Sequence, residues 1–223
     1  MIKLDLHIHS QYSSDGTGTP KEIIKVLQKK GLHGMAITDH NNVKGSLKAI
    51  EVAPKDFIVI PGQEISSHDG HIVALGVKNN IERDLSIEET VEKIIDLGGI
   101  PVIVHLFRNM SGIKKNNFKK IHTKLNTIEV FNSCSVQKSN LKSAKIAKKF
   151  SLGGTGGSDS HIPEFTGYGY TTVDTKDYTV DSILSQINKR KTWGEGEILP
   201  LYYRQDRMIK SVKQFFQRGF KRI

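Results

Sequence analysis

Histidine and acidic residues stand at the ends of several short apolar strands in this chain, and this placement constrains the fold more than any other feature. The first strand is expected at residues 3–9, where Leu4, Leu6 and Ile8 alternate with polar residues and share one face. Later strands are expected at residues 34–40, 57–65, 71–77, 100–105, 127–132 and 168–173.

Helical patterns separate these strands. Thr19 and Glu22 form a capping box with Pro20 at the first helical position, and Ser86 forms a second box with Glu89. Further helices are expected at residues 43–52, 138–150 and 181–189. Strands and helices alternate along all 223 residues without a repeat, which predicts a single α/β domain and favours a barrel.

The polar residues at the strand ends would then meet, because the strands of a β/α barrel end on one rim. They are Asp5, His7 and His9, then Asp39 and His40, then Glu64, then His105, and finally Asp159 and His161 after a glycine-rich turn expected at residues 153–157. One histidine at a strand end is usually an ordinary polar residue. Five strand ends that all carry histidine or an acid favour a functional site.

The spacing of these residues indicates a metal site. His7 and His9 are two positions apart on a strand, so both rings project from the same face and can bind one ion. Imidazole suits Zn, Fe or Mn, and the carboxylates of Glu64 and Asp159 add hard oxygen ligands. We therefore expect two or three divalent ions per chain (Mn, Zn or Fe), held close together by bridging carboxylates and neutral imidazoles.

Positive charge is concentrated in two segments. The chain has 33 Lys and Arg against 23 Asp and Glu, a net charge of +10. Residues 114–149 hold ten lysines and one acid, Glu129, and residues 200–223 hold seven basic residues and one acid, Asp206. Such segments favour phosphate esters, nucleic acids or anionic lipid headgroups as partners, although a solvated lysine-rich face is the simpler alternative.

Residues 196–223 are interpreted as a tail that follows the domain. Apolar residues recur there at helical spacing, with basic residues between them: Met208, Val212, Phe215, Phe216 and Phe220. We expect a basic amphipathic helix that packs on the barrel. A nucleic-acid arm and a membrane-surface helix are the alternatives.

The composition excludes several classes of protein. The single cysteine, Cys134, rules out a scaffold built on internal disulfides. No segment approaches the ~20 apolar residues that a membrane span needs. The strand pattern begins directly after Met1, without the pattern of a signal peptide, so we expect a cytoplasmic protein.

Five segments resemble, in order, the motifs of the PHP (polymerase and histidinol phosphatase) family: DLHIHS at residues 5–10, ITDHN at 37–41, GQEIS at 62–66, VH at 104–105 and GSDSH at 157–161. The resemblance covers residues 1–195. It implies a single distorted (β/α)7 barrel over those residues, with a trinuclear metal site that hydrolyses phosphate esters, followed by the basic C-terminal helix.

The resemblance also implies a set of metal ligands. It assigns a first ion to His7, His9, Glu64 and Asp159, a second ion to Glu64, His71 and His105, and a third ion to Asp15, His40 and His161. His71 is preferred to His68 because the segment that begins at His71 is similar to a strand of the family.

Further roles follow from the same resemblance and from chemistry. We expect His161, Asp159 and His105 to be catalytic, with His161 protonating or positioning the leaving oxygen. Asp5 and Asp39 would orient the ligand imidazoles. Arg108, three residues after His105, would contact the phosphate.

The expected reaction is hydrolysis of a phosphate ester by a metal-activated water, with a nucleotide or a nucleic-acid end as substrate. Nucleic acid could also contact the basic segments. One alternative is a phosphatase of small molecules of the histidinol-phosphate type. A non-catalytic, metal-containing module that binds phosphate or nucleic acid is an alternative of a different class.

Overall fold

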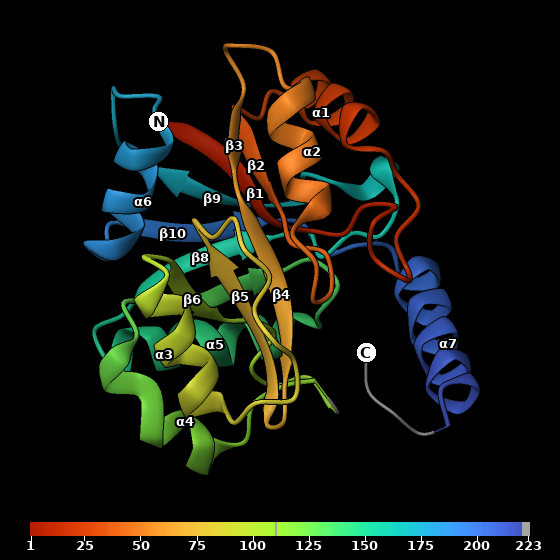
Figure 1. The fold of residues 1–223 in the computed structure, drawn as a ribbon, viewed down its shortest axis with the longest axis vertical. Helices are drawn as coiled ribbons and strands as arrows, with labels where there is room; N and C mark the ends of the chain where they lie inside the picture. Colours follow the sequence, from red (N-terminus) through yellow and green to blue (C-terminus); the bar gives the residue numbers. More distant parts are fainter. Residues whose placement is uncertain (110, 220–223) are drawn as a thin grey trace.

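Two five-stranded mixed sheets form the centre of the molecule (Figure 1). A computed structural model describes residues 1–109 and 111–219. The first sheet has the order β10-β9-β1-β2-β3 and the second the order β4-β5-β6-β7-β8. The strands are β1 (Ile2–Ile8), β2 (Gly34–Ile37), β3 (Ile58–Ile60), β4 (Gly62–Ser67), β5 (Gly70–Leu75), β6 (Ile100–Ile103), β7 (Thr127–Asn132), β8 (Gly153–Gly157), β9 (Gly169–Val173) and β10 (Thr192–Gly196).

The helices lie outside these sheets. They are α1 (Pro20–Lys29), α2 (Lys44–Val52), α3 (Ile87–Asp96), α4 (Lys115–Ile121), α5 (Gln137–Lys149), α6 (Val180–Asn188) and α7 (Leu201–Gln217), with short 3-10 turns at His122–Lys124 and Pro163–Phe165. Both capping boxes are confirmed: the side chains of Thr19 and Ser86 accept from the amides of Glu22 and Glu89 and begin α1 and α3. The sequence analysis missed α4 and β10.

Pro61 joins the two sheets. A single strand was expected over residues 57–65, but the segment is divided at Pro61 into β3 and β4. Proline has no N–H to donate to a strand ladder, so it interrupts the pairing at this point. β3 pairs in parallel with β2 in the first sheet, and β4 pairs antiparallel with β5 in the second.

The sheets meet again at two isolated bridges, Ile8 with Ser160 and His40 with Glu64. The expected (β/α)7 barrel is not confirmed, because the described residues form two mixed sheets rather than one closed sheet. Only two residues separate β4 from β5, and so short a connection requires antiparallel strands. The fold is therefore a mixed α/β fold.

The glycine-rich segment at residues 153–157 is strand β8, so the expected turn was wrong. Glycine is needed here because other strands lie against this backbone. A Cβ atom on Gly156 would lie 2.5 Å from the carbonyl oxygen of Tyr170, and a Cβ atom on Gly157 would lie 2.3 Å from Cβ of His7. The glycines thus let β8 approach β9 and β1 closely, and they bring Asp159 next to His7.

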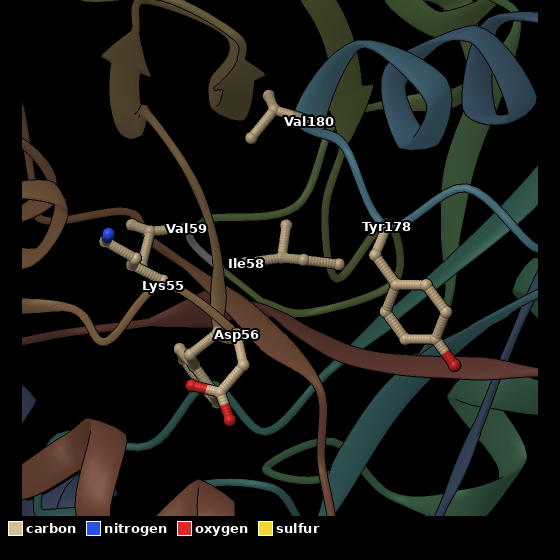
Figure 2. A pocket seen from close by; sticks show the side chains of 7 residues that line it. Lys55, Asp56, Ile58, Val59, Tyr178 and Val180 are labelled. Atoms are coloured by element: carbon tan, nitrogen blue, oxygen red, sulfur yellow. The ribbon is translucent and has the colours of Figure 1, made fainter.

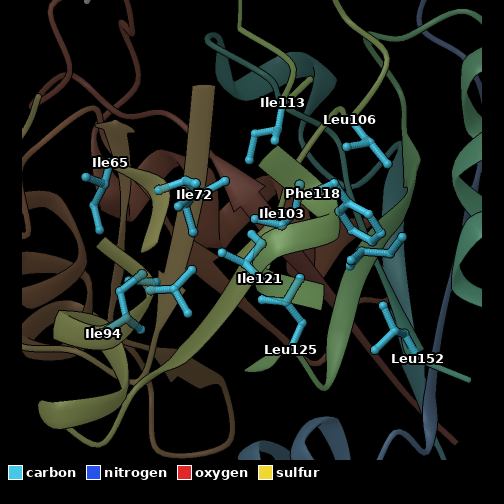
Figure 3. Close-up of a cluster of buried hydrophobic side chains, with 14 of the residues drawn as sticks. Ile65, Ile72, Ile94, Ile103, Leu106, Ile113, Phe118, Ile121, Leu125 and Leu152 are labelled. Carbon is cyan, nitrogen blue, oxygen red and sulfur yellow. The ribbon is translucent and has the colours of Figure 1, made fainter. Parts of the chain in front are cut away.

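Apolar side chains fill one end of the space between the sheets. One buried cluster contains residues of three strands and a helix: Ile2 and Leu4 of β1, Ile60 of β3, Leu75 of β5, and Ile183 of α6. A second cluster packs α3, α4 and α5 against the outer face of the second sheet (Figure 3). With apolar residues at this end, polar residues are left to occupy the other end, near the two isolated bridges.

Helix α7 projects from the body of the molecule (Figure 1). Among the described residues of α7, only Tyr203 is buried, in a small cluster with Phe165 and Leu199. Phe220, which the sequence placed in the same helix, lies outside the described residues. No helix in the described part of the chain is both long and apolar enough to span a membrane.

The Gly156→Ala substitution tests the close approach of the strands. The added methyl has no room beside Tyr170, so we expect the free energy of unfolding to fall by about 1–3 kcal/mol. Lys145→Ala, on the exposed side of α5, should change it by less than about 0.5 kcal/mol. Urea unfolding of both variants measures the difference, and equal stabilities would contradict this account of β8.

Candidate metal centre

Nine ionisable side chains from widely separated segments come together at the polar end of the two sheets. They come from β1 and the loop after it, the loop after β2, β4, the start of β5, the loop after β6, and the loop after β8: His7, His9, Asp15, His40, Glu64, His71, His105, Asp159 and His161. All nine expected ligands are therefore brought into one cluster. We call this cluster the His/Asp/Glu centre.

The carboxylate of Glu64 lies in the middle of this centre. Its Oε1 atom is 3.0 Å from Nδ1 of His71 and 3.0 Å from Nε2 of His105. Its Oε2 atom is 3.3 Å from Nε2 of His9 and 3.2 Å from Nδ1 of His40. Nε2 of His7 also lies 3.5 Å from Oε2, so each oxygen faces a different set of imidazoles, which is an arrangement that suits a carboxylate bridging two ions.

A second carboxylate, that of Asp159, forms a group of four possible ligands with Glu64, His7 and His9. Nε2 of His7 and Nε2 of His9 lie 3.6 and 3.4 Å from Oδ1 of Asp159. The same nitrogens lie 3.5 and 3.3 Å from Oε2 of Glu64. Ligand atoms of a tetrahedral zinc ion with bonds near 2.0–2.1 Å lie about 3.3 Å apart, so these separations suit one ion.

Asp15 forms the third group, on the side of the centre nearest α7. Its Oδ2 atom lies 3.2 Å from Nε2 of His161 and 3.7 Å from Nε2 of His40. Ser13 donates a hydrogen bond of 2.8 Å to the other oxygen, Oδ1. The carboxylate is therefore held with one oxygen directed at the two imidazoles.

Several nitrogen atoms in this centre are buried without a hydrogen-bond partner: Nε2 of His7, Nδ1 and Nε2 of His9, Nδ1 of His40, and Nε2 of His161. A buried polar atom without a partner is unfavourable by about 1–3 kcal/mol. Bound cations would satisfy these lone pairs, and imidazole with carboxylate is a donor set typical of Zn, Fe and Mn. The residues therefore fit a divalent metal centre.

The electrostatics point the same way. Burial opposes ionisation of Glu64, but the imidazoles of His40, His71 and His7 outweigh it and hold its pKa well below the usual value. Burial likewise opposes protonation of His9, yet Asp159 and Glu64 raise its pKa to about 9. The centre thus attracts positive charge, which protonated imidazoles or divalent ions can supply.

Glu129 is a functional residue that the sequence analysis missed. It is buried on β7, its Oε1 atom lies 2.8 Å from Nδ1 of His7, and its Oε2 atom accepts from the amide of His105 at 2.7 Å. A proton on Nδ1 of His7 is thereby directed to Glu129, which leaves Nε2 free for a metal ion. The sequence contains one indication of this role, because Glu129 is the single acidic residue of the lysine-rich segment 114–149 and lies in an expected strand.

Asp5 and Asp39 were expected to orient the ligand imidazoles, but both are buried with hydrogen bonds to backbone amides and to a hydroxyl. Asp5 accepts from the amides of Ser158 at 2.9 Å and Gly167 at 2.7 Å. Asp39 accepts from the amide of Ser10 at 2.6 Å and from its hydroxyl at 2.7 Å. These two carboxylates therefore fix the backbone on which the histidines stand.

The two ring nitrogens of His161 face different groups. Its Nδ1 atom lies 3.0 Å from the carbonyl oxygen of Asp159, which can only accept, so Nδ1 carries the hydrogen. Burial, and then the charge of His9, lower its pKa to about 4. Its Nε2 atom faces Oδ2 of Asp15 at 3.2 Å and has no hydrogen-bond partner, so it is placed to bind an ion, and its expected role at the leaving oxygen stays a prediction.

Two arginines reach the edge of the centre. Arg108 contacts Oδ2 of Asp159 at 2.6 Å and Oδ1 of Asn132 at 3.0 Å, both through Nη2. Arg207, which the sequence did not single out, lies on α7 and contacts Oδ2 of Asp15 at 3.1 Å. The two guanidinium groups thus pair with carboxylates of two different groups in the centre.

His68 and a surface pocket lie outside this centre. The amide of His68 donates to the carbonyl oxygen of Leu85, and the side chain belongs to none of the groups that could hold an ion, whereas His71 faces Glu64. A pocket of about 430 Å³ lies between the start of β3 and the start of α6, next to Tyr178 and Val180 (Figure 2). No residue of the His/Asp/Glu centre lines it.

Comparison with known proteins identifies the family. A family model described as PHP-associated matches residues 137–192. An uncharacterized protein of Methanocaldococcus jannaschii is 34% identical over 143 residues, which are 59% of this chain and 82% of that protein. A 3',5'-nucleoside bisphosphate phosphatase of Chromobacterium violaceum is 37% identical over 82 residues, which are 34% of this chain and 28% of that enzyme.

Solved structures share the fold. A two-domain protein of Bacteroides vulgatus that contains a predicted PHP-like metal-dependent phosphoesterase has a TM-score of 0.75 and 19% identity, over 88% of this chain and 65% of that one. Endonuclease Q, solved with a 27-mer duplex that carries an abasic lesion at the active site, has a TM-score of 0.65 and 18% identity, over 84% of this chain and 56% of that one.

The fold is that of solved PHP-like proteins, and the His/Asp/Glu centre has a donor set that fits divalent metal ions. The chain belongs to the PHP family.

Glu129→Gln tests how the His7 ring is oriented. Glutamine keeps the shape but removes the charge that holds the proton on Nδ1 of His7, so we expect the affinity for divalent metal to fall about 10-fold to 100-fold. The exposed residue Glu195, changed to Gln, is the matched control and should leave the affinity unchanged. Competition with a metal-binding dye measures both affinities. Equal affinities in the two variants would contradict this role of Glu129.

Proposed function

We propose that this chain cleaves a phosphate ester of a nucleotide or of a nucleic-acid end, with two or three divalent ions in the His/Asp/Glu centre. The observation that carries the proposal is the position of Glu64, whose two oxygens face separate sets of imidazoles. A single structural ion would need no shared carboxylate, whereas adjacent ions of a phosphoesterase do.

In this proposal three sets of residues hold the ions. His7, His9, Glu64 and Asp159 hold the first, Glu64, His71 and His105 the second, and Asp15, His40 and His161 the third. Divalent ions at such sites lower the pKa of water and neutralise phosphoryl oxygens, which prepares an ester for in-line attack. Mn, Zn and Fe are all compatible with the donor set.

The protein residues around the ions keep them in place and orient the phosphate. Glu129 and the carbonyl oxygen of Asp159 fix protons on Nδ1 of His7 and of His161, so that each Nε2 faces the centre. The contacts of Arg108 with described residues use Nη2, which leaves Nε and Nη1 to bind a phosphate oxygen. His105 and Asp159 contribute to catalysis as ligands, His105 of the second ion and Asp159 of the first.

Three features support a nucleotide or nucleic-acid substrate. The matched bisphosphate phosphatase and endonuclease Q act on such molecules. Phe107, between His105 and Arg108, is 40% exposed, and Nζ of Lys142 lies 5.5 Å from its ring centroid. An exposed aromatic ring beside cationic groups is a platform on which a base can stack. The lysines of α5 extend this positive surface.

The first experiment is a pooled assay of the purified protein with Mn(II), with and without a chelator. Nucleoside monophosphates, a 3',5'-bisphosphate, histidinol phosphate and a short 5'-phosphorylated RNA are offered together, and mass spectrometry follows the products. We expect chelator-sensitive loss of a nucleotide or of the RNA end. Loss of histidinol phosphate alone would favour the small-molecule phosphatase, and metal binding without turnover would favour a binding module.

His105→Ala tests the second ion. Removal of a group 3.0 Å from Glu64 should lower kcat by at least about 100-fold and reduce the metal content. His122→Ala is the matched control, because His122 lies outside the centre and its Nδ1 contacts the carbonyl oxygen of Lys119. Circular dichroism confirms that both variants are folded. Full activity of His105→Ala with a full metal content would rule out this assignment.

Phe107→Ala tests the substrate class. Loss of base stacking should raise KM for a nucleotide about fivefold or more and leave KM for p-nitrophenyl phosphate unchanged, because that substrate has no base. Leu141→Ala, at another exposed apolar residue, should change neither value. An equal rise for both substrates would show that Phe107 supports the centre rather than a base.

A further inference from the structure

Helix α7 makes few apolar contacts with the rest of the molecule, so hydrophobic packing alone does not explain its position. It is 17 residues long, yet Tyr203 is its only buried residue in the described part of the chain. Met208, Ile209 and Val212 are exposed. An amphipathic helix normally packs its apolar stripe on the core. Here the stripe that faces the body of the protein is formed by Tyr203, Arg204 and Arg207.

Two contacts tie this stripe to the third metal group. The hydroxyl of Tyr203 accepts a hydrogen bond of 3.1 Å from the amide of His161. One turn later, Nη2 of Arg207 lies 3.1 Å from Oδ2 of Asp15, the oxygen that also faces His161 and His40. The side chain of Arg207 is only 16% exposed, so the helix delivers a desolvated cation to the edge of the centre.

The carboxylates that Arg108 and Arg207 contact are linked through two stacked imidazoles. Asp159 lies 3.4 Å from His9, Asp15 lies 3.2 Å from His161, and the ring centroids of His9 and His161 are 4.0 Å apart. Burial, and then the charge of Asp159, raise the pKa of the half-buried Cys134 thiol to about 12, although Arg108, Arg207 and Arg204 oppose this rise. Cys134 itself contacts the carbonyl oxygen of Asp159. The arginines therefore lie at two neighbouring carboxylates of the centre, Arg108 beside Asp159 and Arg207 beside Asp15.

We propose that Arg207 is a phosphate-binding residue that α7 brings to the site, so that a bound phosphate lies between Arg108 and Arg207. The inference rests on the proposed function. A cation held by Asp15 would compete with Arg207 for the Asp15 carboxylate, and the guanidinium would then be available to another anion. The phosphate group of the ester is the anion that this edge of the centre would receive.

The test is the binding of inorganic phosphate to the metal-loaded protein, measured by titration calorimetry. Arg207→Gln should weaken phosphate binding about 10-fold to 100-fold, since a hydrogen bond to a charged group contributes about 1.5–3 kcal/mol. Arg207→Lys keeps the charge but loses the forked geometry of the guanidinium group, so its phosphate affinity should lie between those of the wild type and of Arg207→Gln. Lys210→Gln is the matched control on the same helix, because Lys210 pairs with Asp206 and is exposed.

A positioning role is separated from phosphate binding by two further readouts. Metal content by mass spectrometry should be equal in the wild type, Arg207→Gln and Arg207→Lys, because Arg207 is not a ligand. In turnover assays Arg207→Gln should raise KM more than it lowers kcat. Loss of metal in both Arg207 variants would mean that Arg207 supports Asp15, and this would overturn the proposal.

The calorimetric outcomes also separate this inference from the proposed function. If the wild type and Arg207→Gln bind phosphate equally, Arg207 is not a phosphate ligand and the inference fails while the proposed function stands. If the metal-loaded wild type binds no phosphate and hydrolyses no ester, the proposed function fails and the inference fails with it.

Discussion

The rest of the structure depends on how Glu64 is shared by five histidines. These histidines come from β1, the loops after β1, β2 and β6, and the start of β5, so the carboxylate links segments from both sheets. A buried carboxylate is strongly unfavourable unless cationic or polar groups surround it. The two sheets therefore have to meet here with their polar residues directed inward, and the two isolated bridges lie beside this point.

The backbone is shaped to permit this meeting. Pro61 ends pairing in the first sheet and passes the chain to the second, three residues before Glu64. Gly157 removes the side chain that would collide with His7, so that Asp159 can lie against the strand histidines. Asp5 and Asp39 then hold the two histidine-bearing loops by their backbone amides. Each of these residues contributes to the centre without a position among its proposed ligands.

Much of this arrangement could be predicted from the sequence, and the remainder depends on contacts between distant residues. Alternation and capping boxes are local signals, so β1, α1 and α3 were found. Seven of the nine clustered residues were found because each belongs to one of the five motifs, and Asp15 and His71 were added from the resemblance to the family. By contrast, the role of Glu129 depends on a partner 122 positions away, and the role of Arg207 on one 192 positions away. β8 was taken for a turn because a run of glycines usually indicates one. Here the glycines are needed because neighbouring strands leave no room for a Cβ atom, which the local sequence does not reveal.

The most direct test of a multinuclear centre built on Glu64 is anomalous diffraction from crystals grown with Mn(II). We expect separate peaks on the two sides of the Glu64 carboxylate, one beside His7, His9 and Asp159 and one beside His71 and His105. A further peak is expected beside Asp15 and His161. A single peak with Glu64 bound through one oxygen, or peaks only at exposed carboxylates, would contradict the account.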